Sequence, residues 1–151
     1  MKRNIIKGLI FSVSLTLSLP FLVNGNFTPI AFAENVIIIC HPDVPENSLN
    51  KNDIKNIFLG KKTEWGDNKK IIFVVLKENE THETFLKEYV EKTSFQYLNY
   101  WKKQVFTGKG KPPKSFDTEN ELIDYVANTE GAIGYVSAGI EKKNVKVISV
   151  H

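Results

Sequence analysis

The chain has 151 residues, with 20 Lys or Arg, 17 Asp or Glu and a formal net charge of +3. This length is enough for one domain with a single core, but not for two lobes. Three of the basic residues, Lys2, Arg3 and Lys7, belong to the extreme N-terminus, and the chain from Glu34 onwards has 17 basic and 17 acidic residues. Because the basic excess is confined to that end, we expect no nucleic-acid partner.

Residues 1–33 have the pattern of an export signal rather than of a folded segment. The basic residues are followed by an uncharged apolar run over residues 8–23, and Ala31-Phe32-Ala33 forms an A-x-A cleavage motif. We predict a mature protein that begins at Glu34, that is periplasmic or extracellular, and whose residues 34–151 form one domain. An N-terminal anchor that is not cleaved is the alternative, although the apolar run is short for a membrane span.

Four segments of the mature chain have the composition of buried β-strands. The first two are nearly continuous runs of Ile and Val, which is typical of strands covered on both faces. The predicted strands are Asn35–Cys40, Ile71–Lys77, Ala132–Ser137 and Val145–Val150. Cys40 is the single cysteine, so no intrachain disulfide can form and the stability of the domain must come from packing.

Four helices are predicted between these strands. The first begins at Asn50 and ends near Gly60, and the second spans His82–Val90. The fourth begins at Thr118, where Glu121 completes a capping box. The resulting order is strand, helix, strand, three helices, strand, strand, which favours an α/β fold. We expect a single three-layer domain with a mixed sheet flanked by helices.

The third predicted helix follows Ser94 and ends near Gly108. Its apolar residues are spaced by three or four positions, as on one face of a helix, and we expect that face to be buried. The residues of this face are Phe95, Leu98, Trp101 and Val105.

Three sequence blocks resemble a known family. They are Ile57-Phe58-Leu59-Gly60-Lys61-Lys62 followed by Trp65, then Phe106-Thr107-Gly108-Lys109-Gly110 with the preceding Tyr100-Trp101, and Gly131-Ala132-Ile133-Gly134-Tyr135-Val136. Together they are similar to the phosphate-type substrate-binding proteins of ABC transporters, in the type 2 periplasmic-binding-protein class. The resemblance implies the fold of one lobe of such a protein, binding of phosphate or a related oxyanion for uptake, and an ABC permease as partner.

The resemblance also implies a ligand-binding loop at the start of the helix after the second strand. Members of the family often have a Ser-Gly-Thr-Arg-like sequence there, and the corresponding residues are Asn79, Glu80, Thr81 and His82. Thr81 fits that pattern well. His82 stands where Arg is usual, and the family's second lobe has no room in a chain of this length.

The residues themselves indicate the same loop. Ligands of open α/β sheets bind beyond the carboxyl ends of strands, opposite helix N-termini. Two loops qualify, His41–Leu49 after the first strand and Glu78–Thr81 after the second, and they share one edge if those strands are parallel. Asn79 and Thr81 offer hydrogen-bonding groups, whereas the neighbouring acidic residues oppose an anion. A solvated helix start without a ligand is therefore the alternative.

Other functional signals are sparse. The segment Trp101–Lys114 contains five lysines and no acid, and is either a contact for phosphate or lipid headgroups or a solvated loop. No P-loop, G-x-S-x-G or H-E-x-x-H motif occurs, and the histidines lack close metal-ligand spacing. We expect no enzymatic activity, no cofactor and no metal.

Two functions therefore remain open. The first is an exported solute-binding-type protein, and the second is an extracytoplasmic sensory or adaptor module that binds a protein partner, such as a membrane sensor, instead of a small ligand. The sequence does not indicate an oligomeric state.

Overall fold

The computed structural model describes residues 35–151, and the predicted export signal and its cleavage site lie outside the described residues. The strands are β1 (Val36–Cys40), β2 (Ser48–Leu49), β3 (Ile72–Leu76), β4 (Lys114–Phe116), β5 (Ala132–Ser137) and β6 (Lys146–Val150). The helices are α1 (Lys51–Phe58), α2 (Glu80–Phe85), the π-helical turn η1 (Leu86–Val90), α3 (Ser94–Phe106) and α4 (Glu119–Ala127). None of these helices has the length and apolar character of a membrane span.

The strands form one mixed sheet in the order β2-β6-β1-β5-β3-β4. Strand β1 is antiparallel to both of its neighbours, β5 and β6. Strands β3, β4 and β5 run parallel to one another, with Val74 opposite Lys114 and Ile72 opposite Ala132. The four predicted strands are confirmed. The two edge strands β2 and β4 were not predicted, because segments of two and three residues carry no periodic pattern.

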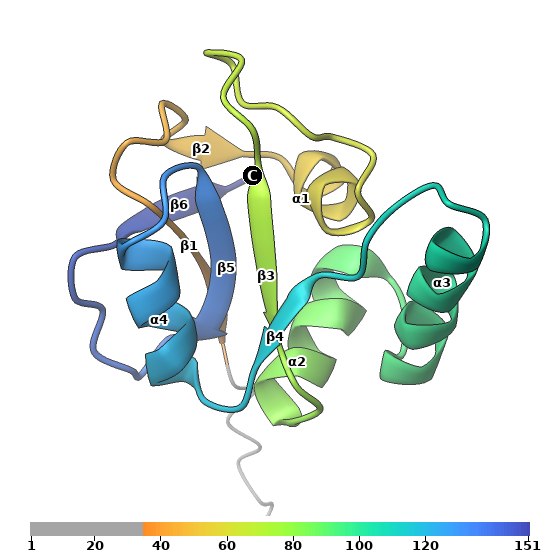
Figure 1. The fold of residues 1–151 in the computed structure, drawn as a ribbon. Helices are drawn as coiled ribbons and strands as arrows, with labels where there is room; N and C mark the ends of the chain where they lie inside the picture. Colours follow the sequence, from red (N-terminus) through yellow and green to blue (C-terminus); the bar gives the residue numbers. More distant parts are fainter. Residues whose placement is uncertain (1–34) are drawn as a thin grey trace, which may run out of the picture. The chain divides into compact units, whose positions relative to one another are not determined.

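Helices cover both faces of the sheet, as the predicted three-layer α/β fold requires (Figure 1). Helix α4 packs on one face, where Gly134 makes room for it. A Cβ atom at Gly134 would lie 2.7 Å from Cδ2 of Leu122 on α4. The glycine in this strand therefore admits a side chain of the covering helix, so that α4 lies close against β5.

The opposite face is covered by α1, α2 and η1 through a cluster of aromatic rings. Phe85 of α2 stacks on Tyr135 of β5 with 3.7 Å between ring centroids. Phe58 of α1 meets Phe85 edge-on at 4.6 Å. All three side chains are fully buried. The edge-on contact between Phe58 and Phe85 adds to the free energy of apolar burial, so this cluster is a main source of stability.

The helix starts are set by local capping. Asn50 caps α1 by accepting a hydrogen bond from the Asp53 N–H at 2.8 Å, as predicted. Thr118 and Glu121 form the predicted capping box of α4. Helix α2 begins at Glu80, two residues before the predicted start, because Asn79 is its cap.

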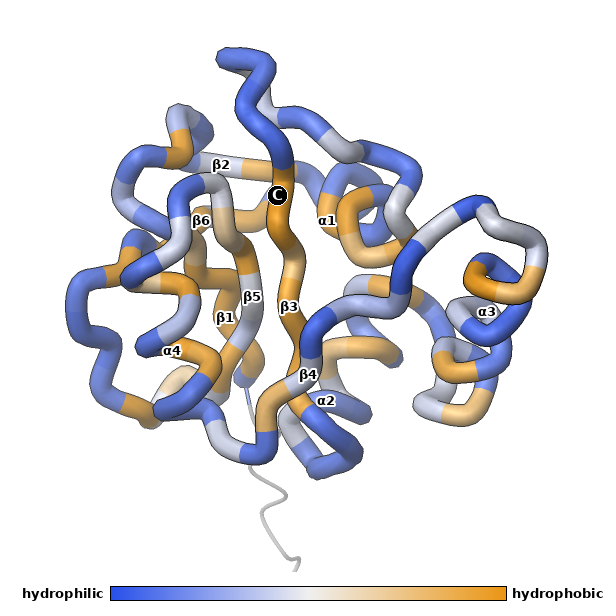
Figure 2. Tube along the Cα trace, in the orientation of Figure 1, coloured by the Kyte–Doolittle hydropathy of each residue, from blue (hydrophilic) through white to orange (hydrophobic). Residues whose placement is uncertain are grey.

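Helix α3 does not bury the predicted face. Of the four residues expected in the core only Trp101 is buried, and Phe95, Leu98 and Val105 are 71%, 52% and 47% exposed. The buried side of α3 carries Tyr97 and Trp101 instead. The main apolar part of the chain is formed by the central strands. Helix α3 has further apolar segments, which lie apart from those strands (Figure 2).

Three contacts fix α3 in this orientation. The hydroxyl of Tyr97 donates to the Phe58 carbonyl oxygen at 2.8 Å, and the Trp101 ring packs against Phe73 with 5.6 Å between centroids. Gly60, with φ +68°, lies beneath the same ring, and a Cβ there would be 2.9 Å from Cη2 of Trp101. A buried tyrosine needs a hydrogen-bond partner for its hydroxyl. The contacts of Tyr97 and Trp101 therefore stabilise this orientation of α3 more than the burial of Phe95 and Leu98 would stabilise the other one.

Candidate functional site

The carboxyl ends of the three parallel strands β3, β4 and β5 meet at one edge of the sheet. Helix α2 starts there after β3, and α4 starts there after β4. Thr81, Glu119 and Ser137 come from these three segments, and their side chains are hydrogen-bonded to one another. This edge is where an α/β sheet ordinarily binds its ligands, and it contains the predicted loop.

Asn79 and Glu80 lie at the surface of this edge. The side-chain oxygen of Asn79 accepts a hydrogen bond from the His82 N–H at 2.8 Å, and is used to cap α2. Both Asn79 and Glu80 are exposed. Asn79 therefore has only its side-chain NH2 group for a ligand, while Glu80 contributes a negative charge in the first turn of the helix.

Thr81 is buried, and its hydroxyl is directed at a carboxylate of the protein itself. Its Oγ1 donates to Oε1 of Glu119 at 2.9 Å. The same Oε1 accepts from the Ser137 N–H at 2.9 Å, and Oε2 accepts from the Ser137 hydroxyl at 2.8 Å. Two hydroxyls and one N–H thus bind both oxygens of one carboxylate. We call these donors, from Thr81 and Ser137, the carboxylate cradle.

His82 is in the core rather than on the helix surface. It is 6% exposed, and its Nδ1 lies 2.5 Å from the hydroxyl of Tyr135. That hydroxyl also accepts from the Leu76 N–H at 3.1 Å. The Tyr135 hydroxyl is therefore hydrogen-bonded both to the backbone of β3 and to the imidazole of His82. His82 is therefore a structural link between α2 and the strands β3 and β5.

Burial keeps His82 uncharged at neutral pH. Desolvation lowers the pKa of His82 from 6.5 to about 4, and burial raises the pKa of Tyr135 well above its usual value. Both side chains are thus neutral in the folded protein over the physiological range. The charge switch near pH 6.5 that an exposed histidine would provide is absent at this position, and His82 gives no positive charge to the edge.

The surface around the start of α2 is acidic. Glu78, Glu80 and Glu83 are all exposed, and Lys77, the nearest base in sequence, is paired with Asp117 at 2.7 Å. Carboxylates at a helix N-terminus stabilise its dipole and repel other anions. An oxyanion from solution therefore meets like charge at this edge, as well as donors that Glu119 already uses.

The second predicted loop, His41–Leu49, lies at the opposite edge of the sheet. The two loops were expected to share an edge if their strands were parallel. That condition is not met, because β1 runs antiparallel to β5 and β3 is parallel to β5. The loop is held in place by Asp43, which accepts hydrogen bonds from the Gly131 N–H at 3.3 Å and from Lys69 at 3.2 Å. Burial alone raises the pKa of Asp43, but these bonds and one with His41 outweigh it and lower the pKa.

Cys40, next to this loop, is buried at the end of β1. Burial raises the pKa of its thiol to about 12, which removes its nucleophilic form at neutral pH. Among residues 35–151, no group of three His, Cys, Asp or Glu side chains has a metal-binding arrangement.

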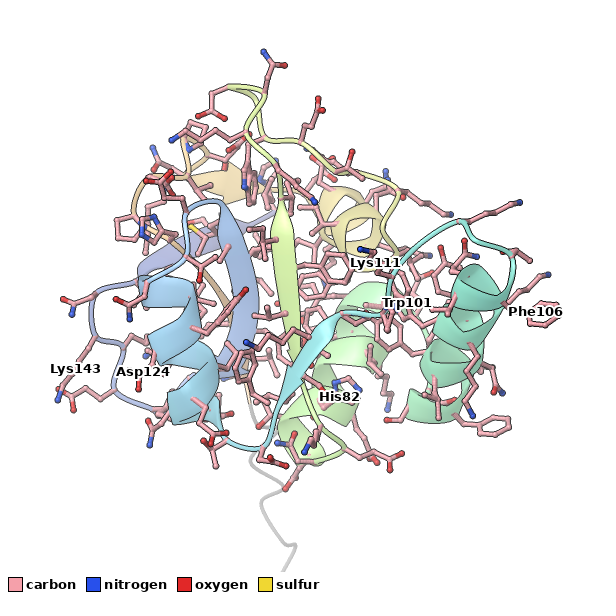
Figure 3. All side chains as sticks on the ribbon, in the orientation of Figure 1. His82, Trp101, Phe106, Lys111, Asp124 and Lys143 are labelled. Atoms are coloured by element: carbon pink, nitrogen blue, oxygen red, sulfur yellow. The ribbon has the colours of Figure 1, made fainter. Side chains whose placement is uncertain are left out.

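A hollow of about 330 Å³ opens beside the predicted loop, between α2, α3 and the strands β3 and β4. His82 and Trp101 both point toward this region (Figure 3), and Tyr97, Pro112 and Pro113 complete its mainly apolar wall. Lys77 and Glu78 also line the hollow. It offers an apolar surface next to the acidic edge, rather than a cluster of cationic groups.

Two residues of the site were missed from the sequence, Glu119 and Ser137. Glu119 directly follows the N-cap Thr118, where an acidic residue is ordinary, and Ser137 is the last residue of β5. Only the parallel order of β3, β4 and β5 brings both of them to Thr81. The strand order is not visible in one sequence, so no local signal could have joined these residues.

Comparison with known proteins gives one family match, over residues 23–149, to a family described as the PBP superfamily domain. No curated protein is a significant match. Solved structures with a similar fold include an ABC-type phosphate transport receptor from Vibrio cholerae, with a TM-score of 0.55 and 17% identity over 76% of this chain and 45% of that chain.

A candidate phosphate ABC transporter substrate-binding protein of Clostridium perfringens, solved with bound phosphate, has a TM-score of 0.60 and 21% identity over 76% of this chain and 44% of that chain. PstS from Borrelia burgdorferi has a TM-score of 0.58 and 17% identity over 77% of this chain and 47% of that chain. At these identities the likeness shows the fold alone. The chain spans less than half the length of each of these structures.

Proposed function

Because the chain belongs to the family of PBP superfamily domains, we propose that it is an exported solute-binding-type protein that binds phosphate or a related oxyanion. The proposed site is the loop Asn79–His82 together with the carboxylate cradle, and the proposed partner is an ABC permease. Two structurally similar proteins, from Vibrio cholerae and Clostridium perfringens, are described as a phosphate transport receptor and as a phosphate transporter component with bound phosphate, which supports this choice of ligand.

One observation carries the proposal. The hydroxyls of Thr81 and Ser137 and the Ser137 N–H converge on the two oxygens of Glu119, at 2.8 to 2.9 Å. These donors have the number and geometry that an oxyanion needs, because they already hold one. The Glu119 carboxylate stands in for the ligand that the cradle would otherwise bind.

The same observation predicts weak binding by the natural chain. An incoming oxyanion must displace Glu119, and it must do so near three further exposed carboxylates. Two unit charges 4 Å apart interact by about 4 kcal/mol at the dielectric of a protein surface, which is enough to mask a micromolar site. In this proposal Glu119 occupies the donors of the cradle and so determines the affinity for the oxyanion.

Isothermal titration with phosphate and sulfate tests the proposal on the natural chain and on Glu119→Ala. We expect the variant to bind phosphate at least about ten-fold more tightly, because the competing carboxylate is gone. Thr81→Val added to Glu119→Ala should abolish the gain. Glu141→Ala is the matched control, because Glu141 is 75% exposed in a surface ion pair with Lys143. No heat from either protein at millimolar anion would overturn the proposal.

The second candidate is the sensory or adaptor module that binds a protein partner. The bonds between the cradle and Glu119 favour this module, because the donors of the cradle then have partners without a small ligand. Capture from solubilised membranes distinguishes the two functions. Recovery of a sensor protein by the natural chain, with no oxyanion binding by Glu119→Ala, would support the module, whereas recovery of a permease together with oxyanion binding would support uptake.

A further inference from the structure

Exposed apolar side chains are concentrated on α3. Among residues 35–151, five large apolar side chains are strongly exposed, and four of them belong to this helix. Phe106 is 93% exposed, Phe95 71%, Leu98 52% and Val105 47%. Successive members are three, seven and one residues apart. Because an α-helix has 3.6 residues per turn, this spacing puts all four on one side of α3. We call these four residues the α3 outer face.

The segment that carries this face is also the basic part of the domain. Residues 94–116 contain five lysines and no acidic residue, whereas the rest of residues 35–151 contains 12 lysines and 16 acidic residues. The five are Lys102, Lys103, Lys109, Lys111 and Lys114, and all are exposed. None of them makes a salt bridge with another described residue. The ammonium group of Lys114 lies over the Tyr125 ring, 4.4 Å from its centroid, and the positive charge of the other four is available to a partner.

The charges and apolar groups are combined most closely at the C-terminal end of α3. Lys102 is four residues after Leu98 and three before Val105, so helical spacing puts it on the same side of α3. Phe106 points away from the rest of the domain (Figure 3). Around the start of the helix, three acidic residues and two lysines line a hollow together with Phe95: Glu78, Glu83, Glu91, Lys87 and Lys92. An anionic surface would therefore be met by the end of α3 and the loop that follows.

We propose that the α3 outer face and the lysine-rich loop after it bind the surface of a membrane that contains anionic phospholipid. A helix with Phe and Leu on one side and Lys beside them lies in the interface, with its apolar groups among the acyl chains and its ammonium groups at the phosphates. Each lysine near such a surface strengthens binding about five-fold. Four exposed apolar residues and the four lysines Lys102, Lys103, Lys109 and Lys111 supply both interactions in one segment of the chain.

A second copy of the chain fits this face less well. In a two-fold symmetric contact each surface meets the same surface, so the lysines of one α3 would lie against those of the other. Like charges at such distances repel. A lipid surface has the opposite charge and accepts Phe106 without requiring a complementary pocket. The inference is independent of the function proposed for the Thr81 edge.

Vesicle co-sedimentation tests the proposal with residues 34–151, which contain the whole described core and omit the apolar leader. Urea denaturation first establishes that this fragment unfolds cooperatively. We expect it to bind vesicles of phosphatidylcholine and phosphatidylglycerol, but not of phosphatidylcholine alone, and to be released by salt. Lys102→Gln with Lys103→Gln should weaken binding about 25-fold, and Phe106→Ser about ten-fold.

Matched changes elsewhere separate this face from general charge or hydrophobicity. Lys142→Gln with Lys143→Gln removes two lysines at a site far from Phe106 in Figure 3, and Val147→Ser changes the fifth exposed apolar residue, which is 49% exposed. Neither should weaken vesicle binding by more than about two-fold. Equal losses for the control and the α3 variants would overturn the proposal, as would binding that does not depend on phosphatidylglycerol.

A second readout does not depend on binding strength. In Phe106→Trp the new indole is exposed in solution, and its emission should shift to shorter wavelength when anionic vesicles are added. The same experiment with Val147→Trp should show no added shift. An unchanged Phe106→Trp spectrum would overturn the proposal. It would also be overturned if sedimentation equilibrium showed that the natural protein is a dimer and Phe106→Ser a monomer, because the face would then bind a second copy of the chain.

Discussion

The two helical segments that follow β3 are built in opposite ways. In α2 and η1 the apolar residues face the sheet, and Phe85, Leu86 and Val90 are fully buried. In α3 the apolar residues face mostly outwards, and Tyr97 and Trp101 alone are buried. Both segments have helical apolar spacing in the sequence. The difference teaches that such spacing predicts a helix, whereas polar contacts decide which side of the helix is covered.

The comparison is tested most strongly by removing one phenylalanine from each segment. Phe85→Ala should lower the free energy of unfolding by about 3–5 kcal/mol, because it leaves a cavity between Phe58 and Tyr135. Phe95→Ala, the same change on the exposed face of α3, should stay within about 0.5 kcal/mol. Urea denaturation measures both, and similar losses would mean that Phe95 is covered in solution.

The anchor of α3 is tested by two glycines with nearly equal backbone conformations. Gly60 has φ +68° and Gly108 has φ +69°. Alanine in this conformation costs about 1–2 kcal/mol at either position. Gly60→Ala also brings a Cβ against the Trp101 ring, whereas nothing lies within 4 Å of the corresponding atom at Gly108. We therefore expect Gly60→Ala to be less stable than Gly108→Ala by about a further 1 kcal/mol, measured by thermal and urea unfolding.

The buried His82 makes the α2 side of the comparison sensitive to pH. Its pKa is lowered from 6.5 to about 4 by burial, so between these values the unfolded chain binds a proton that the folded protein does not. The stability contributed by neutral His82 is complete above pH 6.5 and is lost as the pH falls toward 4. From pH 7 to pH 5 the loss is on the order of 2 kcal/mol.

Urea denaturation at the two pH values measures this loss. His82→Gln should remove the histidine part of the pH dependence while lowering stability at pH 7. His151→Gln, at the exposed C-terminus, should leave the pH dependence of the natural chain intact. A pH profile that is the same in all three proteins would mean that the pKa of His82 is the same in the folded and unfolded states.

The smallest expected effect is that of Phe106→Ser. Phe106 is 93% exposed, so its removal should change the free energy of unfolding by less than about 0.5 kcal/mol. Chemical denaturation of the variant beside the natural chain measures this difference. A loss above about 1 kcal/mol would show that the end of α3 is packed in solution. Both helical segments would then bury their apolar residues.

The sequence was sufficient for most of the fold. The runs of Ile and Val in β1 and β3 and the caps Asn50 and Thr118 predicted their elements, because each depends on neighbours in the chain. The three blocks around Gly60, Gly108 and Gly134 indicated the family that the match over residues 23–149 now gives. Such signals are local, and they are correct wherever a local cause decides the structure.

The site was less accessible to prediction because its causes are distant in the chain. Thr81 and Ser137, 56 positions apart, are both bonded to Glu119 only because β3, β4 and β5 are parallel. The position of His82 depends on the Tyr135 hydroxyl, 53 residues away. The antiparallel direction of β1 moved the His41–Leu49 loop to the other edge. One sequence carries no signal for strand order, so these contacts require the structure.

The two edge strands also limit how copies of this protein can aggregate. Strand β4 has three residues and β2 has two, so each leaves a very short row of unpaired backbone groups. Pro112 and Pro113 precede β4 without N–H donors, and Lys114 begins it. Short edges, proline and lysine all oppose the edge-to-edge addition that starts fibrils. The apolar strands β1, β3 and β5 are thereby kept inside the sheet, and concentrated solutions of the folded protein should resist amyloid growth.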